Sequence, residues 1–201
     1  MTAPSTAKPD TAVHFRPAAR DDARTIAELY SIASDGVSDY IWSQLAEPGE
    51  ELLDVGAKRY ARENTAFSYQ NCEMAEFDGT VAGMLLGYRV PPADPNDEPV
   101  SDPILKGLSE LEIPDSYYIA GIAMWPDRRS AGIGSALMAR AHERARTDGM
   151  TQASLIAFER NDAAVRLYER LGYGIVDRRP LVPHPLIHYT DGDALLMAID
   201  L

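Results

Sequence analysis

The sequence predicts a mixed α/β (α+β) fold in which helices flank one central sheet. Two observations predict this class. Residues 72–90 have the pattern of a β-hairpin that turns at Asp78–Gly79, which requires an antiparallel pair of strands. From residue 117 onward, apolar strand-like stretches alternate with helical patterns, which indicates strands connected through helices. Together these patterns favour a mixed sheet over a run of repeated βαβ units.

Seven stretches have the length and the apolar or alternating pattern of strands. They are residues 13–18, 72–77, 81–90, 117–124, 153–158, 173–177 and 194–201. Helical spacing predicts helices at residues 21–36, 40–45, 52–63, 132–147 and 161–172, with a further short helix at 104–111. Asn161 suits a helix N-cap, and Gly172 suits the position just past a helix end.

Bulk properties indicate a soluble globular protein. A chain of 201 residues favours one domain, which we assign to residues 13–201, preceded by a disordered polar tail over residues 1–12. The single cysteine, Cys72, fits a small strand residue in a protein of the reducing cytoplasm. No apolar run is long enough to span a bilayer. The formal net charge of −12 disfavours binding to nucleic acid or to an anionic membrane.

Residues 91–115 differ from the rest of the chain in composition. They contain six prolines, seven carboxylates and one lysine. We interpret this segment as a long connection between strands, a kind of loop that is often functional. Its acidity favours a cationic substrate.

The run Arg128–Ser135 is a glycine-rich turn between a strand-like stretch and a long helical pattern. Glycines let the backbone approach a ligand closely, and a helix start presents unpaired N–H groups to an anion. A basic residue beside such a turn suits a pyrophosphate. The turn lacks the Gly-Lys-Ser/Thr of a P-loop and the third glycine of a dinucleotide fingerprint, since position 137 is leucine.

Two motifs resemble the GNAT superfamily of acetyl-CoA-dependent N-acetyltransferases. Arg129–Gly134 is similar to that family's pyrophosphate loop, Arg/Gln-x-x-Gly-x-Gly/Ala, and Ile122–Pro126 to its strand end. About thirty residues later, Asn161–Tyr173 resembles its second signature, N-x-x-A-x-x-L-Y-x-x-x-G-F/Y. The resemblance covers residues 117–177 closely and residues 13–201 loosely. It implies a largely antiparallel sheet of about seven strands that is splayed between strands four and five.

The resemblance also implies acetyl-CoA as co-substrate and a set of site residues. The backbone around residues 130–135 and the Arg129 side chain would bind the pyrophosphate, and the fourth strand would pair with the pantetheine arm. The implied cofactor-binding residues are Ile122, Ala123, Met124, Arg129, Ser130, Ala131, Gly132, Ile133, Gly134, Ser135, Asn161 and Tyr168. The implied catalytic residues are Met124, whose N–H would stabilise the oxyanion, and Tyr168, as general acid to the departing thiolate.

The general base stays open, because the predicted strand 117–124 contains no carboxylate. Glu110, Glu112 and Asp115 lie just upstream, either Tyr117 or Tyr118 could relay a proton, and a water chain would serve as well.

Residues 184–189 offer a second open question. His184 and His188 are four residues apart, but neighbouring prolines argue against a helical metal pair, and we expect no metal. Both histidines and Tyr189 are instead candidates for contact with the acceptor.

The sequence therefore predicts an N-acetyltransferase that moves an acetyl group from acetyl-CoA to a primary amine, in a small molecule or a peptide, by direct attack in a ternary complex. The alternative is a non-catalytic acyl-CoA-binding sensor or scaffold. Neither nucleic acid nor membrane is an expected partner, and a homodimer is an expected assembly because dimers are common in the family.

Overall fold

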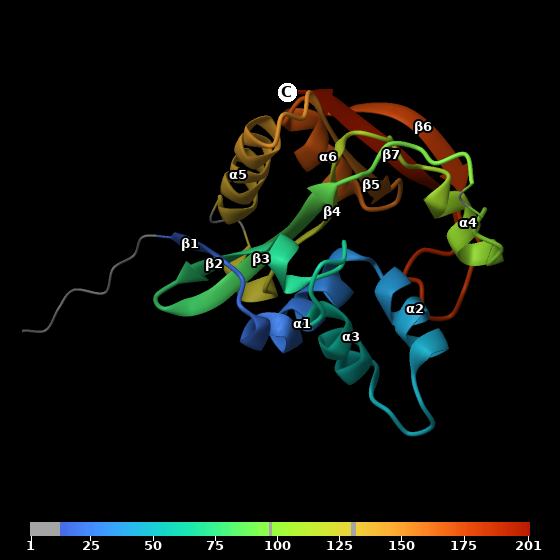
Figure 1. The fold of residues 1–201 in the computed structure, drawn as a ribbon, viewed down its shortest axis with the longest axis horizontal. Helices are drawn as coiled ribbons and strands as arrows, with labels where there is room; N and C mark the ends of the chain where they lie inside the picture. Colours follow the sequence, from blue (N-terminus) through green and yellow to red (C-terminus); the bar gives the residue numbers. More distant parts are fainter. Residues whose placement is uncertain (1–12, 97, 130–131) are drawn as a thin grey trace, which may run out of the picture.

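The computed structural model describes residues 13–96, 98–129 and 132–201 (Figure 1). The strands are β1 (His14–Pro17), β2 (Cys72–Phe77), β3 (Thr80–Arg89), β4 (Tyr117–Met124), β5 (Gln152–Phe158), β6 (Gly174–Pro180) and β7 (Asp193–Asp200). The α-helices are α1 (Ala23–Ala33), α2 (Val37–Leu45), α3 (Leu52–Tyr60), α4 (Pro103–Ser109), α5 (Ile133–Thr147) and α6 (Asp162–Arg170). The tail predicted at residues 1–12 lies outside the described residues.

All seven predicted strands form a single sheet in the order β1-β2-β3-β4-β5-β7-β6. Each pair of neighbours is antiparallel except β4 and β5, which are parallel. The predicted hairpin is β2–β3, which turns at Asp78–Gly79. The mixed, largely antiparallel sheet is thus confirmed.

The sheet splits between β4 and β5. These two strands are paired only over Tyr117–Ile119 and Ala153–Leu155, after which β4 continues along β3 and β5 continues along β7. The β3–β4 register shifts at Leu86/Gly87, and this shift leaves Ala120 as an extra residue in β4. A bulge of this kind bends a strand. The predicted splay between strands four and five is therefore confirmed, and it begins at a bulge.

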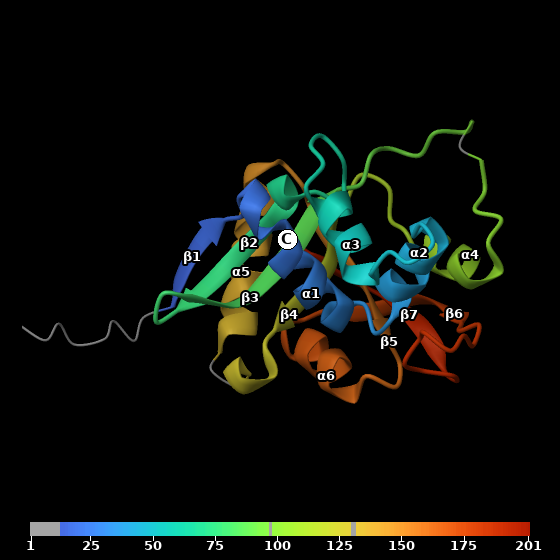
Figure 2. The same cartoon turned by 90° about the horizontal axis from the view of Figure 1, so that it is seen from below.

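Helices cover both faces of the sheet (Figures 1 and 2). On one face, α5 and α6 pack on β3, β4 and β5 through buried residues such as Leu137, Met138 and Leu155. On the other face, α1, α2 and α3 pack on β2, β3 and β4 around Ile26 and Leu29. The two apolar layers are separated by the sheet, except where β4 and β5 diverge.

The connection 91–115 carries α4 out to the side of α2 (Figures 1 and 2). Asp102 caps α4 by accepting hydrogen bonds from the N–H groups of Ile104 (2.8 Å) and Leu105 (3.1 Å). The same carboxylate accepts a 2.6 Å hydrogen bond from the Tyr40 hydroxyl of α2. At the other end of α4, Arg179 of β6 pairs with Glu110 at 2.9 Å. This connection is therefore attached to both halves of the molecule.

Two further sequence predictions can be compared with the described residues. Cys72 is buried at the start of β2, as predicted for a small strand residue. Within the described ranges, no helix combines the length and the apolar character needed to cross a membrane.

Candidate active site

The edge of β4 faces the opening between β4 and β5. The N–H of Trp125 donates to the carbonyl of Ala82 in β3 at 3.0 Å. Because successive N–H groups of a strand point to opposite sides, the N–H and C=O groups of Met124 and Ile122 point away from β3, toward the opening. Those of Ala123 point to β3, and its side chain is buried. The opening therefore exposes alternate backbone groups of β4.

The start of α5 lies beside this edge. Gly132 caps the helix in the left-handed region, with φ of 76°, and its carbonyl accepts the first helical hydrogen bond from Ala136 at 3.1 Å. The N–H groups of residues 133–135 precede that bond, so they are available to an anion. A Cβ at Gly134 would lie 2.9 Å from Cε of Met124, so this glycine lets α5 contact the end of β4.

Arg129 directly follows the short 3-10 turn Pro126–Arg128 that comes after β4, and it is exposed. Ser130 and Ala131, both predicted to bind the cofactor, lie outside the described residues. Ser135 is exposed on the first turn of α5, whereas Ile133 is buried.

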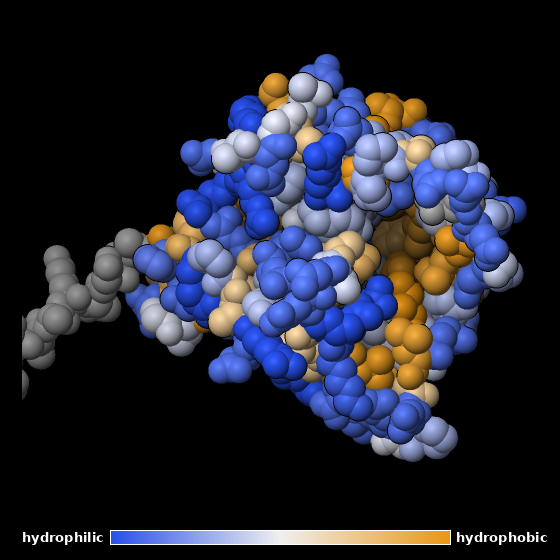
Figure 3. All heavy atoms as spheres, in the orientation of Figure 1, coloured by the Kyte–Doolittle hydropathy of each residue, from blue (hydrophilic) through white to orange (hydrophobic). Residues whose placement is uncertain are grey.

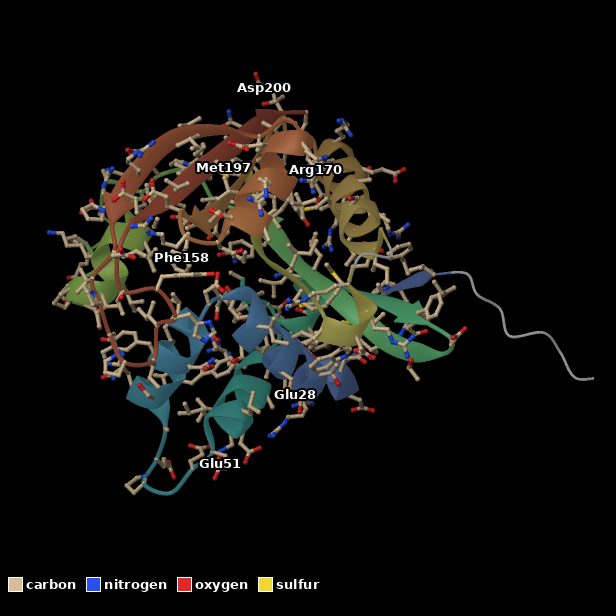
Figure 4. All side chains as sticks on the ribbon, turned by 180° about the vertical axis from the view of Figure 1, so that it is seen from behind. Glu28, Glu51, Phe158, Arg170, Met197 and Asp200 are labelled. Atoms are coloured by element: carbon tan, nitrogen blue, oxygen red, sulfur yellow. The ribbon has the colours of Figure 1, made fainter. Side chains whose placement is uncertain are left out.

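A cavity of about 360 Å³ lies between the α1–α3 layer, α4 and the split in the sheet. Figure 3 shows its mouth as a hollow with hydrophobic residues on its walls. Aromatic side chains of the α1–α3 layer and of β3 and β4 line it: Tyr30, Trp42, Tyr60, Phe67, Tyr88 and Tyr118. Phe158, at the end of β5, lines it from the C-terminal half of the sheet (Figure 4). Its volume and its apolar walls suit a small ligand or a peptide end.

Tyr168 reaches this cavity from the opposite layer. It belongs to α6 and packs with the α5 side of the sheet, yet it lines the cavity together with Tyr30 and Trp42 of the other layer. It does so at the split, where the two layers meet. Its side chain is 8% exposed, and burial raises the pKa of Tyr168 far above its ordinary value. The hydroxyl therefore keeps its proton at neutral pH.

Asp35 is a residue of this cavity that the sequence analysis missed. It lies in the turn between α1 and α2, and Asn161 donates a hydrogen bond from Nδ2 to its Oδ2 at 3.0 Å. Nδ1 of His188 lies 3.8 Å from its Oδ1. Burial is the main cause that raises the pKa of Asp35. The Asp-Gly pair in the sequence indicated only the end of a helix, because the partners of Asp35 lie more than 120 residues away along the chain.

Asn161 has two contacts at the start of α6. Its Oδ1 accepts a hydrogen bond from the N–H of Ala164 at 3.2 Å, which confirms the predicted helix cap. Its amide nitrogen holds Asp35. Asn161 also lines the cavity, so a single side chain connects α6 to the α1–α2 turn.

Of the residues that were candidates for the general base or for proton relay, some line the cavity and others do not. Glu112 and Tyr118 line the cavity, and the Glu112 charge contributes to raising the pKa of Tyr118 and of Tyr88. Glu110 pairs with Arg179 at 2.9 Å, and Asp115 pairs with Arg89 at 2.6 Å. Tyr117 is buried in the layer of α5. The cavity thus brings together Glu112, Tyr118 and the unpredicted Asp35.

The segment 184–189 packs beside the α1–α2 turn. The ring of His184 lies 4.7 Å from that of Tyr40, and the ring of Tyr189 lies 5.8 Å from that of Phe158. Of the two histidines in this segment, the structure brings His188 next to the cavity carboxylate Asp35. Within the described ranges, no cluster of three or more His, Cys, Asp or Glu side chains could hold a metal ion.

The comparison with family models gives one match, which decides the family. The model of the acetyltransferase (GNAT) family matches residues 29–173, which is most of the chain. The chain belongs to the GNAT family. It is therefore an acyltransferase, and the two sequence motifs that resembled the family lie within the matched range. A comparison with curated proteins finds no match.

Solved structures of N-acetyltransferases have the same fold. An N-acetyltransferase from Staphylococcus aureus Mu50 has a TM-score of 0.64 and 19% identity, over 92% of this chain and 100% of that one. The NatC complex bound to Gag peptide and CoA has a TM-score of 0.57 and 16% identity, over 94% and 98% of the chains. PaiA N-acetyltransferase from Thermoplasma acidophilum, in complex with coenzyme A, has a TM-score of 0.56 and 14% identity, over 94% and 99%. These likenesses establish the fold of this GNAT protein.

Proposed function

We propose that this GNAT protein transfers the acetyl group of acetyl-CoA to a primary amine, by direct attack within a ternary complex. One observation carries the proposal. At the split in the sheet, the free edge of β4, the start of α5 and the Tyr168 side chain lie around the same opening as the aromatic cavity. Donor and acceptor can therefore meet there without a covalent enzyme intermediate.

The donor side supplies contacts for the two chemically distinct parts of acetyl-CoA. The N–H groups of residues 133–135 and the Arg129 guanidinium are suited to the pyrophosphate. We include Gly132, Ser130 and Ala131 in this loop, the last two on the sequence motif alone. The pantetheine arm carries amide groups, which can pair with the backbone of Ile122 and Met124 as an added strand does. Ala123 lies between these two residues, and its own backbone groups pair with β3.

The chemistry requires an oxyanion donor and a proton for the departing sulfur. Acetyl-CoA supplies an activated thioester carbonyl. The Met124 N–H points into the opening, so it is placed to donate to the carbonyl oxygen as negative charge develops there. The buried Tyr168 hydroxyl is protonated at neutral pH, so it can donate its proton to the thiolate.

The acceptor side favours an amine with an apolar body. Eight of the residues that line the cavity are aromatic, and its charged lining residues are the carboxylates Asp35 and Glu112 and the guanidinium Arg59. A protonated amine is attracted to such carboxylates. NatC is bound to a Gag peptide in its solved structure, so an N-terminal peptide belongs in the test beside small amines.

The test is release of free thiol from acetyl-CoA with a panel of small amines and peptides. We expect turnover with apolar or aromatic primary amines. Saturable binding of acetyl-CoA without turnover on any amine would instead favour the alternative, a non-catalytic acyl-CoA-binding module. A homodimer, a cytoplasmic location and the absence of nucleic-acid and membrane partners stay predictions of the sequence.

Tyr168→Phe separates a catalyst from a binder. Loss of general acid catalysis should lower kcat by about 10²-fold while leaving the fold intact. Tyr173→Phe is the matched control, because its ring lies 6.0 Å from that of Tyr168 but its hydroxyl bonds to His142 at 2.7 Å. Equal kcat values for the two variants would remove Tyr168 from the mechanism.

A further inference from the structure

The turn that carries Asp35 is held rigidly against the segment 186–188. Asp35 and Gly36 both have positive φ, of 48° and 93°. The N–H of His188 donates to the Asp35 carbonyl at 2.9 Å, and a Cβ at Gly36 would lie 1.9 Å from the Leu186 carbonyl oxygen. A non-glycine residue in the left-handed region is uncommon, and such positions cluster at functional sites. The backbone around Asp35 is therefore fixed by residues about 150 positions later.

The Asp35 carboxylate is oriented by side chains of two other segments. Asn161 of α6 donates to Oδ2 at 3.0 Å, and the His188 ring lies 3.8 Å from Oδ1. Only 16% of the Asp35 side chain is exposed, whereas that of His188 is 57% exposed. The carboxylate thus lines a cavity on one side and contacts a solvent-accessible imidazole on the other.

Asp35 and Tyr168 are electrostatic neighbours. Burial is the main cause that raises the pKa of Tyr168 and of Tyr189, and the Asp35 charge raises both further. Tyr168 from α6 and His188 and Tyr189 from the segment after β6 are the titratable groups that the structure places against Asp35. A carboxylate that can take a proton and a hydroxyl that can donate one therefore line the same cavity, at the split in the sheet.

We propose that Asp35 is the proton acceptor of the acetyl transfer and that its carboxylate receives the ammonium group of the acceptor substrate. Asn161 and His188 are positioning residues that hold the carboxylate, and His188 also connects it to solvent. This inference rests on the proposed function. It assigns the general base, which the sequence left open, to a residue that lies outside both sequence motifs.

The proton balance requires such a group. An amine of pKa near 10 is protonated at neutral pH, so it must lose a proton before it can attack. Asp35 takes that proton and passes it through His188 to water. Attack forms the C–N bond and breaks the C–S bond, and Tyr168 gives its proton to the sulfur. Asp35 then takes the second proton of the nitrogen and returns it to Tyr168. One proton ends on the thiol and one in solvent.

Glu112 fits this role less well. It is exposed, and its charge acts on Tyr88 and Tyr118 of the cavity, while Tyr168 responds to Asp35. Burial also raises the pKa of Asp35, which makes its carboxylate a better proton acceptor than an exposed one.

The test compares Asp35→Asn with Asp39→Asn, using thiol release with an active amine over a range of pH. Asp39 is the matched control, because it is half-buried in α2, four residues after Asp35, and accepts a 2.9 Å hydrogen bond from Ser31, but does not line the cavity. We expect Asp35→Asn to lower kcat/KM at neutral pH by about 10²-fold or more, and Asp39→Asn to leave it near the wild-type value. Affinity for acetyl-CoA should be unchanged in both variants.

The pH dependence distinguishes a base from a structural residue. Wild-type kcat/KM should fall as pH drops through the raised pKa of Asp35, because the protonated carboxyl cannot accept a proton. The rate of Asp35→Asn should rise about tenfold per pH unit toward the pKa of the amine, since that variant depends on amine that is already neutral. A structural defect would leave a ratio between wild type and variant that does not change with pH.

The outcomes separate this inference from the proposed function. A wild-type protein that binds acetyl-CoA but acetylates no amine overturns both. An active wild type whose Asp35→Asn variant keeps its rate and its pH profile overturns the role of Asp35 alone. If Asp35→Asn does not fold, His188→Gln replaces it: a lower kcat with an altered acidic limb supports the inference, and an unchanged profile contradicts it.

Discussion

At the residue scale, Gly36 lets the turn that carries Asp35 pack closely against the backbone of Leu186. We expect Gly36→Ala to destabilise the protein by about 2–4 kcal/mol, because its φ of 93° strains any other residue and the new Cβ meets the Leu186 carbonyl. Gly49→Ala is the control, since Gly49 has a similar φ of 86° but no atom within 4 Å of the added Cβ. The free energy of unfolding of the Gly49→Ala variant should fall by only about 1 kcal/mol. Urea denaturation measures the stability of both variants. An equal loss of stability in the two would show that the close contact of Gly36 with residue 186 does not affect stability.

Residues differ in how far the sequence alone could reveal their roles. Tyr168 and the loop at Arg129 stand at fixed spacings within motifs, so a resemblance was enough to single them out. Asp35 has no such signature. Its environment is built by Asn161 and His188, which only the folded chain brings to it. A base formed from three distant segments cannot be predicted from local pattern.

At the scale of elements, a side-chain hydrogen bond attaches the start of α4 to α2. The Tyr40 hydroxyl donates to the Asp102 cap at 2.6 Å, and Leu105 and Leu108 of α4 line the cavity. We expect Tyr40→Phe to speed amide hydrogen exchange in residues 103–109 and to raise KM for the amine, with KM for acetyl-CoA unchanged. Tyr69→Phe is the control, because Tyr69 donates to Glu63 at 3.0 Å on the surface. A Tyr40→Phe variant that exchanges like wild type would show that α4 is held by its other contacts.

Element positions were largely predictable, whereas element ends were less so. The predicted helix 52–63 ends at Tyr60, and the predicted helix 21–36 begins as a 3-10 turn and stops at Ala33. Apolar spacing identifies the buried face of a helix, but the last turn depends on capping and on neighbouring loops. The β2–β3 hairpin was predicted from its turn, whereas no local pattern specifies that β7 lies between β5 and β6.

At the scale of the whole molecule, the split divides the sheet into two parts joined by three residue pairs, Tyr117–Ile119 against Ala153–Leu155. Near this junction the buried hydroxyls of Ser116 and Ser154 are 3.0 Å apart. Beyond it, the two apolar layers meet at the cavity instead of being separated by paired strands. A ligand in the opening would therefore complete the sheet as well as take part in a reaction.

This arrangement predicts how acetyl-CoA should stabilise the fold. At a concentration 100 times its Kd, acetyl-CoA should add about 2.7 kcal/mol to the free energy of unfolding, which corresponds to a rise in Tm of roughly 5–10 °C. Hydrogen exchange resolved by residue should slow at the N–H groups of Ile122 and Met124, which face the opening. Exchange of the Ala123 N–H, which is already directed to β3, should change little. S-acetyl-N-acetylcysteamine, which lacks the pyrophosphate, is the control and should leave Tm nearly unchanged at the same concentration. Equal slowing at all three residues would mean that binding rigidifies the region without adding a strand to the edge of β4.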